Sequence, residues 1–104
     1  MLRRKDMEKQ QEQEVYKEAI ELFGITSQKV MVIEEMSELI KELCKELRDR
    51  GNVENIADEL ADVEITLAQI KHIYNIHDMV EEHKDFKLRR LSAIMTKIKS
   101  EQDK

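Results

Sequence analysis

The chain has no proline and only two glycines, Gly24 and Gly51, so very little in it interrupts a helix. Apolar residues recur at helical spacing and predict four helices. We expect them from about residue 7 to 23, from a cap at Thr26 or Ser27 to about residue 50, from a cap at Asn52 to a turn near residues 77–78, and from an Asp78–Glu81 cap onward.

Each expected helix has an apolar stripe that should face a core. The stripes are Val15, Ala19 and Leu22; Ile33, Met36, Ile40, Leu43 and Leu47; Ile56, Leu60, Val63, Leu67, Ile70 and Tyr74; and Leu88, Leu91, Ile94, Met95 and Ile98. Short connections make successive helices antiparallel neighbours. The sequence therefore predicts one all-α domain over residues 1–104, a four-helix antiparallel bundle whose polar ends, 1–6 and 99–104, fray.

The chain has little apolar material for a core of its own. Apolar residues make up 40% of its 104 residues and charged residues 39%, and a domain this small buries only a modest core. We therefore expect a homo-oligomer. The single Cys44 excludes a disulfide within one chain and indicates a reducing compartment; we expect it in or near the core. No run approaches the roughly 20 apolar residues that cross a bilayer, and no secretory signal is present, so we expect a cytoplasmic protein without a membrane partner.

Charge is unevenly distributed along the chain. The net charge is −5, with eleven acids against four bases in residues 31–64 and seven bases against five acids in residues 81–104. A nucleic-acid groove needs clustered Lys and Arg, and aromatic residues among them to stack bases. Because the middle of the chain is acidic, the sequence argues against nucleic-acid binding.

Two acidic pairs, Glu35/Glu38 and Glu59/Asp62, have i,i+3 spacing, which places both carboxylates of a pair on one helix face. On antiparallel helices the four carboxylates would converge, and they would repel one another unless a cation or protons neutralised them. Oxygen ligands favour a hard ion such as Mg²⁺. The alternative is two solvated helix faces, because acids are frequent throughout the chain.

The two acidic pairs differ in their angular distance from the apolar stripes of their helices. Glu59 lies only about 60° from the centre of its apolar stripe, and Asp62 continues along the same flank. Glu35 lies at roughly 110° from the stripe of its own helix, and Glu38 is nearly opposite that stripe. The projection favours a site on the third helix. It leaves open whether the second helix is buried on two sides or whether Glu38 is exposed.

Three strings of this sequence resemble the MazG-like all-α nucleoside triphosphate pyrophosphohydrolases, in particular the small phage and prophage type. They are Gly24-Ile25-Thr26-Ser27-Gln28, Glu34-Glu35-Met36-Ser37-Glu38-Leu39-Ile40-Lys41 and Asp58-Glu59-Leu60-Ala61-Asp62-Val63-Glu64-Ile65. They match the family signature E-E-x-x-E, a spacer, and E-x-x-D. The resemblance covers about residues 15–91 and implies cleavage of a nucleoside triphosphate to monophosphate and pyrophosphate.

The resemblance also implies roles for particular residues. Carried over, the metal ligands are Glu35, Glu38, Glu59 and Asp62, which would bind Mg²⁺, with Mn²⁺ able to substitute. Two or more ions are possible, and their number stays open. Glu38 or Glu34 would position or deprotonate the attacking water. For Glu34 a solvated or helix-bracing role stays open.

Four further residues are candidates for binding substrate. Gln28 matches a family position between the first two helices. His83, Lys87 and Arg90 follow at i, i+4 and i+7 on the fourth helix, where cations could hold phosphate charge that magnesium leaves unbalanced. The alternative for these three is a solvated face whose long side chains lie over the core.

The sequence therefore predicts an oligomeric, Mg²⁺-dependent pyrophosphohydrolase of (deoxy)nucleoside triphosphates, a dimer or tetramer with the pocket between the second and third helices, completed by another subunit. One alternative is an enzyme like phosphoribosyl-ATP pyrophosphohydrolase. Another is a non-catalytic helical adaptor, whose acids would be solubilising or structural. The base, the sugar and the biological role stay open.

Overall fold

The computed structural model describes residues 6–103 of the chain. Within that range all regular structure is α-helical and no strand is present. The helices are α1 (Lys9–Phe23), α2 (Ile25–Leu47), α3 (Val53–Tyr74) and α4 (His77–Gln102). The all-α prediction, with four helices, is confirmed. None of the helices in this range has an apolar stretch that could span a bilayer.

A single glycine separates α1 from α2. Gly24 has φ 92°, a conformation that L side chains rarely adopt. Its N–H donates a hydrogen bond to the Ile20 carbonyl at 2.9 Å, and its carbonyl accepts one from the Gln28 N–H at 3.1 Å. The predicted stop at Gly24 is confirmed. The predicted caps at Thr26 and Ser27 are wrong, because Gly24 itself occupies the N-cap position and both residues lie in the first turn of α2.

The turn between α2 and α3 is built from Asp49, Gly51 and Asn52. Asp49 has φ 59°, and α2 ends at Leu47, before the boundary near residue 50 that was predicted. A Cβ on Gly51 would lie 2.7 Å from the backbone nitrogen of Glu46, so only glycine fits without a shift. The Asn52 side chain accepts a hydrogen bond from the Asn55 N–H at 2.8 Å, which confirms it as the N-cap of α3.

The start of α4 differs from the prediction. Ile76 is the N-cap, and Asp78 lies inside the first turn. The proposed Asp78–Glu81 capping box is therefore wrong, although an acid in this turn still interacts favourably with the helix dipole. The helix continues to Gln102, within the end that was expected to fray. Fraying of the two ends stays a prediction, and residues 1–5 and 104 lie outside the described range.

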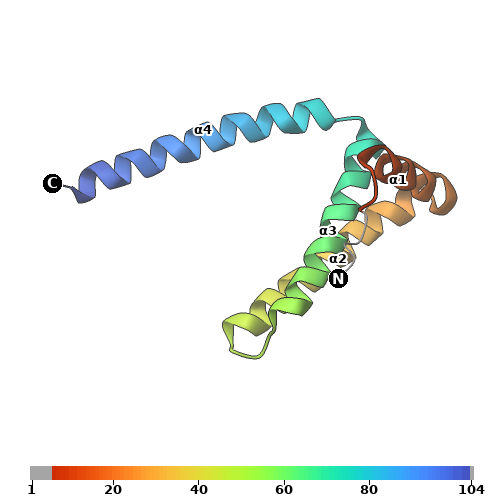
Figure 1. Cartoon of the computed structure of the whole chain (residues 1–104), viewed down its shortest axis with the longest axis horizontal. Helices are drawn as coiled ribbons and strands as arrows, with labels where there is room; N and C mark the ends of the chain where they lie inside the picture. Colours follow the sequence, from red (N-terminus) through yellow and green to blue (C-terminus); the bar gives the residue numbers. More distant parts are fainter. Residues whose placement is uncertain (1–5, 104) are drawn as a thin grey trace. The chain divides into compact units, whose positions relative to one another are not determined.

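The chain forms two compact units, one ending at Tyr74 and one beginning at Asn75. In the first, α2 and α3 lie side by side and antiparallel, and α1 packs against both (Figure 1). The second consists of α4 and the turn before it. The antiparallel arrangement of α2 and α3 is confirmed. The four-helix bundle and the single domain of residues 1–104 stay predictions.

Helix α1 is held against α3 by polar and aromatic contacts. His72 forms a hydrogen bond with the Gln13 side chain. The Tyr16 and His72 rings lie with their centroids 6.2 Å apart, tilted by 46°. Of the apolar stripe predicted for this helix, Ala19 is half-buried, whereas Val15 and Leu22 are exposed.

The face of α2 that packs against α3 is not the predicted apolar stripe. Ile40 is 61% exposed and Leu47 81%, and the other stripe residues are exposed as well. The buried and half-buried positions instead include Gln28, Val32, Glu35, Leu39 and Glu42, about 90° to 100° round the helix from the stripe. The core-facing role predicted for the stripe is therefore wrong within a single chain. Cys44 is also exposed, against the prediction.

Few hydrophobic side chains in the described range are buried. Only Val32 and Val63 are, and they face the α2–α3 contact. Of the stripe predicted for α3, Ile56 and Ile70 are half-buried. The remaining stripe residues of α3 are exposed, as are those of α4, and these are Leu60, Leu67 and Tyr74, and Leu88, Leu91, Ile94, Met95 and Ile98. The core of residues 6–103 is thus very small.

The exposed stripes of α2 and α3 lie on the same side of the helix pair. Lys29, on the stripe side of α2, has its Nζ 4.6 Å from the centroid of the Tyr74 ring on α3. On each helix, the stripe is rotated about the helix axis away from the residues of the α2–α3 contact. Because the two helices are antiparallel, these rotations bring both stripes to the same side of the pair. We call this surface the apolar flank, and it comprises Ile33, Met36, Ile40, Leu43 and Leu47 of α2 and Leu60, Leu67 and Tyr74 of α3.

Candidate functional site

The contact between α2 and α3 is unusually polar. On α2 the buried residues are Gln28, Val32 and Glu42. On α3 they are Val63, Thr66 and Gln69. The Thr66 hydroxyl is satisfied within its own helix, because it donates to the Asp62 carbonyl at 3.0 Å or to the Val63 carbonyl at 3.1 Å. The larger polar groups here need other partners, because a buried polar group without a hydrogen bond destabilises the fold.

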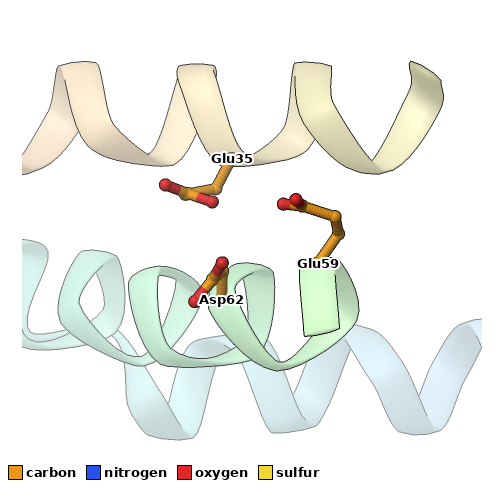
Figure 2. Close-up of side chains that lie close together, drawn as sticks. All are labelled: Glu35, Glu59 and Asp62. Carbon is orange, nitrogen blue, oxygen red and sulfur yellow. The ribbon is translucent and has the colours of Figure 1, made fainter. Parts of the chain in front are cut away.

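Three carboxylates meet in the middle of this contact. Glu35 extends from α2 toward α3, and Glu59 and Asp62 extend from neighbouring turns of α3 toward α2 (Figure 2). One carboxylate oxygen from each lies within 4.8 Å of the others. We call these three residues the carboxylate cluster. Its members come from both predicted acidic pairs, so the expected convergence is found for three of the four acids.

Proximity and partial burial make the charged forms of two members less favourable. The pKa of Glu35 is raised, first by partial burial and then by the negative charges of Asp62 and Glu59, a hydrogen bond with the Asp62 carboxyl, and the charge of Glu38. A hydrogen bond between two carboxyl groups requires a proton on one of them. Without a cation, the cluster therefore favours the protonated forms of Glu35 and Glu59 more than an isolated carboxyl group would.

The pKa of Glu59 is raised for similar reasons. Partial burial is the largest cause, followed by the negative charges of Asp62, Asp58, Glu38 and Glu42. Negative charge therefore surrounds Glu59 from both helices, and a bound cation would relieve all of these repulsions at once.

Glu42 is a site residue that sequence reasoning missed. It is only 8% exposed, and its Oε1 lies 3.4 Å from Lys45 Nζ. Its Oε2 is buried without a hydrogen-bond partner among the described residues. Its charge also contributes to the raised pKa of Glu59. A buried carboxylate oxygen that nothing satisfies is a group to which a water-coordinated cation could offer hydrogen bonds.

Two signals in the sequence could have identified Glu42. It lies seven residues after Glu35, which places it on the same helix face. It also lies three residues before Lys45, a spacing at which oppositely charged side chains pair on one helix face. The Oε1 of Gln69 is likewise buried without a hydrogen-bond partner in the described chain. Gln69 is one of the buried residues of α3. Neither residue belongs to an acidic motif, and their burial became evident from the packing of α2 on α3.

The donor set fits a hard divalent cation. The ligands on offer are all carboxylate oxygens, which suit Mg²⁺, Ca²⁺ or Mn²⁺ and not zinc or copper. Mg²⁺ is usually held by one or two carboxylates together with water and substrate phosphates. The three carboxylates of the cluster meet that requirement without further protein ligands.

The remaining predicted ligand and base are at or beyond the edge of the cluster. Glu38 is exposed, but its charge affects both Glu35 and Glu59. Its role as a fourth ligand stays a prediction. Glu34 is exposed as well, and its role as the base stays a prediction.

The predicted substrate-binding residues fall in both units. Gln28 is 4% exposed, on the α3-facing side of α2, two turns before Glu35. His83, Lys87 and Arg90 are exposed residues of α4, where the Arg90 guanidinium lies 5.9 Å from the Phe86 ring centroid. The structure therefore does not bring these three cations to the cluster within one unit, and their role stays a prediction.

No family model, curated protein or solved structure matches the chain.

Proposed function

We propose that this chain is a Mg²⁺-dependent nucleoside triphosphate pyrophosphohydrolase that releases a nucleoside monophosphate and pyrophosphate. One observation carries the proposal: Glu35 meets Glu59 and Asp62 across two antiparallel helices, with oxygens within 4.8 Å. These are the residues on which the ligands of the resembled family fall. The unsatisfied oxygen of Glu42 beside Glu59 supports it independently, because it increases the demand for a cation.

Different residues of the chain would bind the metal ion and transfer the proton. Glu35, Glu59 and Asp62 would hold the ion through their carboxylate oxygens. When bound, Mg²⁺ neutralises phosphate charge and makes coordinated water more acidic. Water attacks the α phosphorus, the bond from that phosphorus to the bridging oxygen breaks, and pyrophosphate leaves. Glu38, at the solvent-facing edge of the cluster, would accept the proton of the water and release it to solvent.

We infer as well that the chain acts as a homo-oligomer, a dimer or a tetramer. The support is the exposure of the apolar flank and of the α4 stripe, while only two described hydrophobic residues are buried. A folded chain gains about 1.5–3 kcal/mol for each large apolar side chain that it buries, so a partner that covered these surfaces would add substantial stability. A second copy could also bring His83, Lys87 and Arg90 to the phosphates, in the cytoplasm where such substrates occur.

The decisive experiment is a panel of ribo- and deoxynucleoside triphosphates, with phosphoribosyl-ATP included, incubated with the protein and Mg²⁺. Pyrophosphate and orthophosphate are measured separately. We expect pyrophosphate and monophosphate only. Activity confined to phosphoribosyl-ATP would identify the alternative enzyme, and release of orthophosphate with a diphosphate would contradict cleavage at the α phosphorus.

Matched variants connect the activity to the cluster. Glu59→Gln and Asp62→Asn keep the size of the side chain and remove its charge. We expect each to reduce kcat/KM by at least about 100-fold, the upper end of what loss of an outer-shell partner costs a metal site. Glu64→Gln, an exposed position on the same helix, should stay near wild type. Equal activity in all variants would contradict the proposed site, and no hydrolysis together with no response to Mg²⁺ would favour the adaptor.

A further inference from the structure

A hollow beside the carboxylate cluster has no role in the function described so far. It has a volume of about 270 Å³ and lies between the start of α1 and the middle of α3, within the first unit. Met7, Val15, Tyr16 and Ile65 provide apolar walls, and Glu12 provides the only charged group among the described lining residues. Sites that enclose drug-sized ligands measure roughly 300–1,000 Å³. This hollow therefore suits a smaller group, such as one aromatic ring or two fused rings.

Contacts between α1 and α3 hold the residues that line the hollow in place. The Gln13–His72 hydrogen bond and the Tyr16–His72 ring contact fix α1 on α3 next to it. Tyr16 is thus held between the hollow on one side and α3 on the other. A site whose walls are fixed before binding loses little entropy when a ligand enters.

The hollow also lies within reach of the cluster. Ile65 in its wall and Asp62 in the cluster are three residues apart on α3, so that they occupy adjacent turns, with Cβ atoms about 5–6 Å apart. A nucleotide whose phosphates are held at the cluster would therefore extend its base past the sugar toward this hollow. The apolar walls and the aromatic ring suit the faces of a base. Glu12 is the lining residue that can form hydrogen bonds with the edge of the base.

Glu12 restricts which base edge is accepted. An ionised carboxylate has acceptor oxygens only. Guanine presents two adjacent donors, its ring N–H and its amino group, which match two carboxylate oxygens. Thymine and uracil present one N–H between two carbonyl oxygens, and those oxygens would face the carboxylate unfavourably. Adenine and cytosine present an amino group next to a ring acceptor and lie between these cases.

We propose that this hollow binds the base of the triphosphate substrate and that Glu12 selects guanine over thymine and uracil. The inference rests on the proposed function for the position of the phosphates. Tyr16, which lines the hollow, carries a hydroxyl that can donate a hydrogen bond, and partial burial and the charges of Glu12 and Glu64 raise its pKa.

The kinetic test compares kcat/KM for dGTP and dTTP. Because a hydrogen bond to a charged group is stronger than one between neutral groups, wild type should prefer dGTP by at least roughly tenfold. Glu12→Gln places a donor beside the remaining acceptor and should remove most of this preference. Glu14→Gln, an exposed neighbour on α1 that does not line the hollow, should keep it. A preference for dTTP, or one that Glu12→Gln leaves intact, would overturn the inference.

A binding test separates this inference from the proposed function. Guanosine and thymidine monophosphates are titrated without metal while the NMR signals of the Val15 and Ile65 methyl groups are followed. Shifts with the guanine nucleotide alone would uphold the hollow even if no triphosphate were hydrolysed. If triphosphates are hydrolysed but neither nucleotide moves these signals, the base is bound elsewhere and only the present inference fails.

Discussion

A carboxylate that is half-buried beside two others is less stable in its charged form than it is in the unfolded chain. Glu35 and Glu59 are in this position, and their pKa values are raised by partial burial and by neighbouring negative charge. Such an arrangement lowers the stability of the protein without its ligand, and residues at functional sites are often strained in this way. The cluster thus gives the metal proposal a direct thermodynamic consequence.

That consequence is a pH dependence of stability that magnesium removes. A raised pKa means that the folded protein holds its proton to a higher pH than the unfolded chain does. Between the ordinary carboxyl pKa of 4.5 and the raised values, the folded state binds more protons. The contribution of Glu35 and Glu59 is therefore complete below about pH 4.5 and is lost as the pH rises through their folded-state pKa values.

Thermal melts of wild type and of the Glu59→Gln variant in EDTA test this prediction. The variant should be more stable than wild type at pH 7, and the difference should shrink toward pH 4.5. Adding Mg²⁺ at pH 7 should raise the melting temperature of wild type and have little effect on the variant. Glu64→Gln should respond to Mg²⁺ as wild type does. If Glu59→Gln is less stable than wild type in EDTA at pH 7, the repulsion inferred for this residue is wrong.

At the scale of the helices, the positions where elements begin and end depend on few side chains. One glycine both ends α1 and caps α2, and the side chain of Asn52 caps α3. These ends matter for the site, because a shift of α3 along its axis would move Glu59 and Asp62 relative to Glu35. The residues of the α2–α3 turn thus set the register of the cluster.

The prediction at this scale concerns the cap of α3. Asn52→Ala removes the acceptor of the Asn55 N–H and should lower the free energy of unfolding by about 1 kcal/mol. Asn55→Ala is the matched control, since only its backbone takes part in the cap, and alanine favours a helix interior. Urea unfolding followed by circular dichroism measures both. A larger loss for Asn55→Ala than for Asn52→Ala would contradict the assignment of the cap.

At the scale of the whole molecule, large apolar side chains are exposed in both compact units. The apolar flank and the α4 stripe are both exposed, and contiguous apolar patches commonly mark interaction sites. Meanwhile the contact between α2 and α3 contains charged and amide side chains. Helices with a polar contact between them need stabilisation from elsewhere, and the apolar flank is the surface that could provide it.

We therefore predict that the flank mediates self-association. Ile40→Asp and Leu43→Asp introduce a charge on it, and each loses about 1.5–3 kcal/mol of apolar burial, so that dissociation constants should rise by roughly 10-fold or more. Lys41→Asp is the control, because Lys41 lies about 120° round α2 from the centre of the apolar stripe. Sedimentation velocity gives the oligomeric state and circular dichroism the helix content. A monomeric wild type, or an oligomer that Ile40→Asp leaves unchanged, would rule out this surface.

Local geometry explains how much the sequence could predict. The four helices, the stop at Gly24 and the cap at Asn52 follow from the preferences of neighbouring residues, and the sequence carries that information in full. The i,i+3 pairs were also sufficient to place Glu59 beside Asp62, because one helix fixes their separation. Thr26, Ser27 and Asp78 misled the prediction, since competing residues at the same helix ends took the cap positions.

Which face of α2 meets α3 was decided by tertiary structure alone. Hydrophobic periodicity identifies an apolar face but not the neighbour that it contacts, so the stripe from Ile33 to Leu47 was assigned to the wrong contact. The same limitation hid Glu42, whose burial depends on a helix about a dozen residues further along the chain. The sequence by itself determined four helices and two acidic pairs. Only the packing of α2 on α3 decided that Glu35 joins Glu59 and Asp62, because that distance depends on how two separate helices rotate against each other.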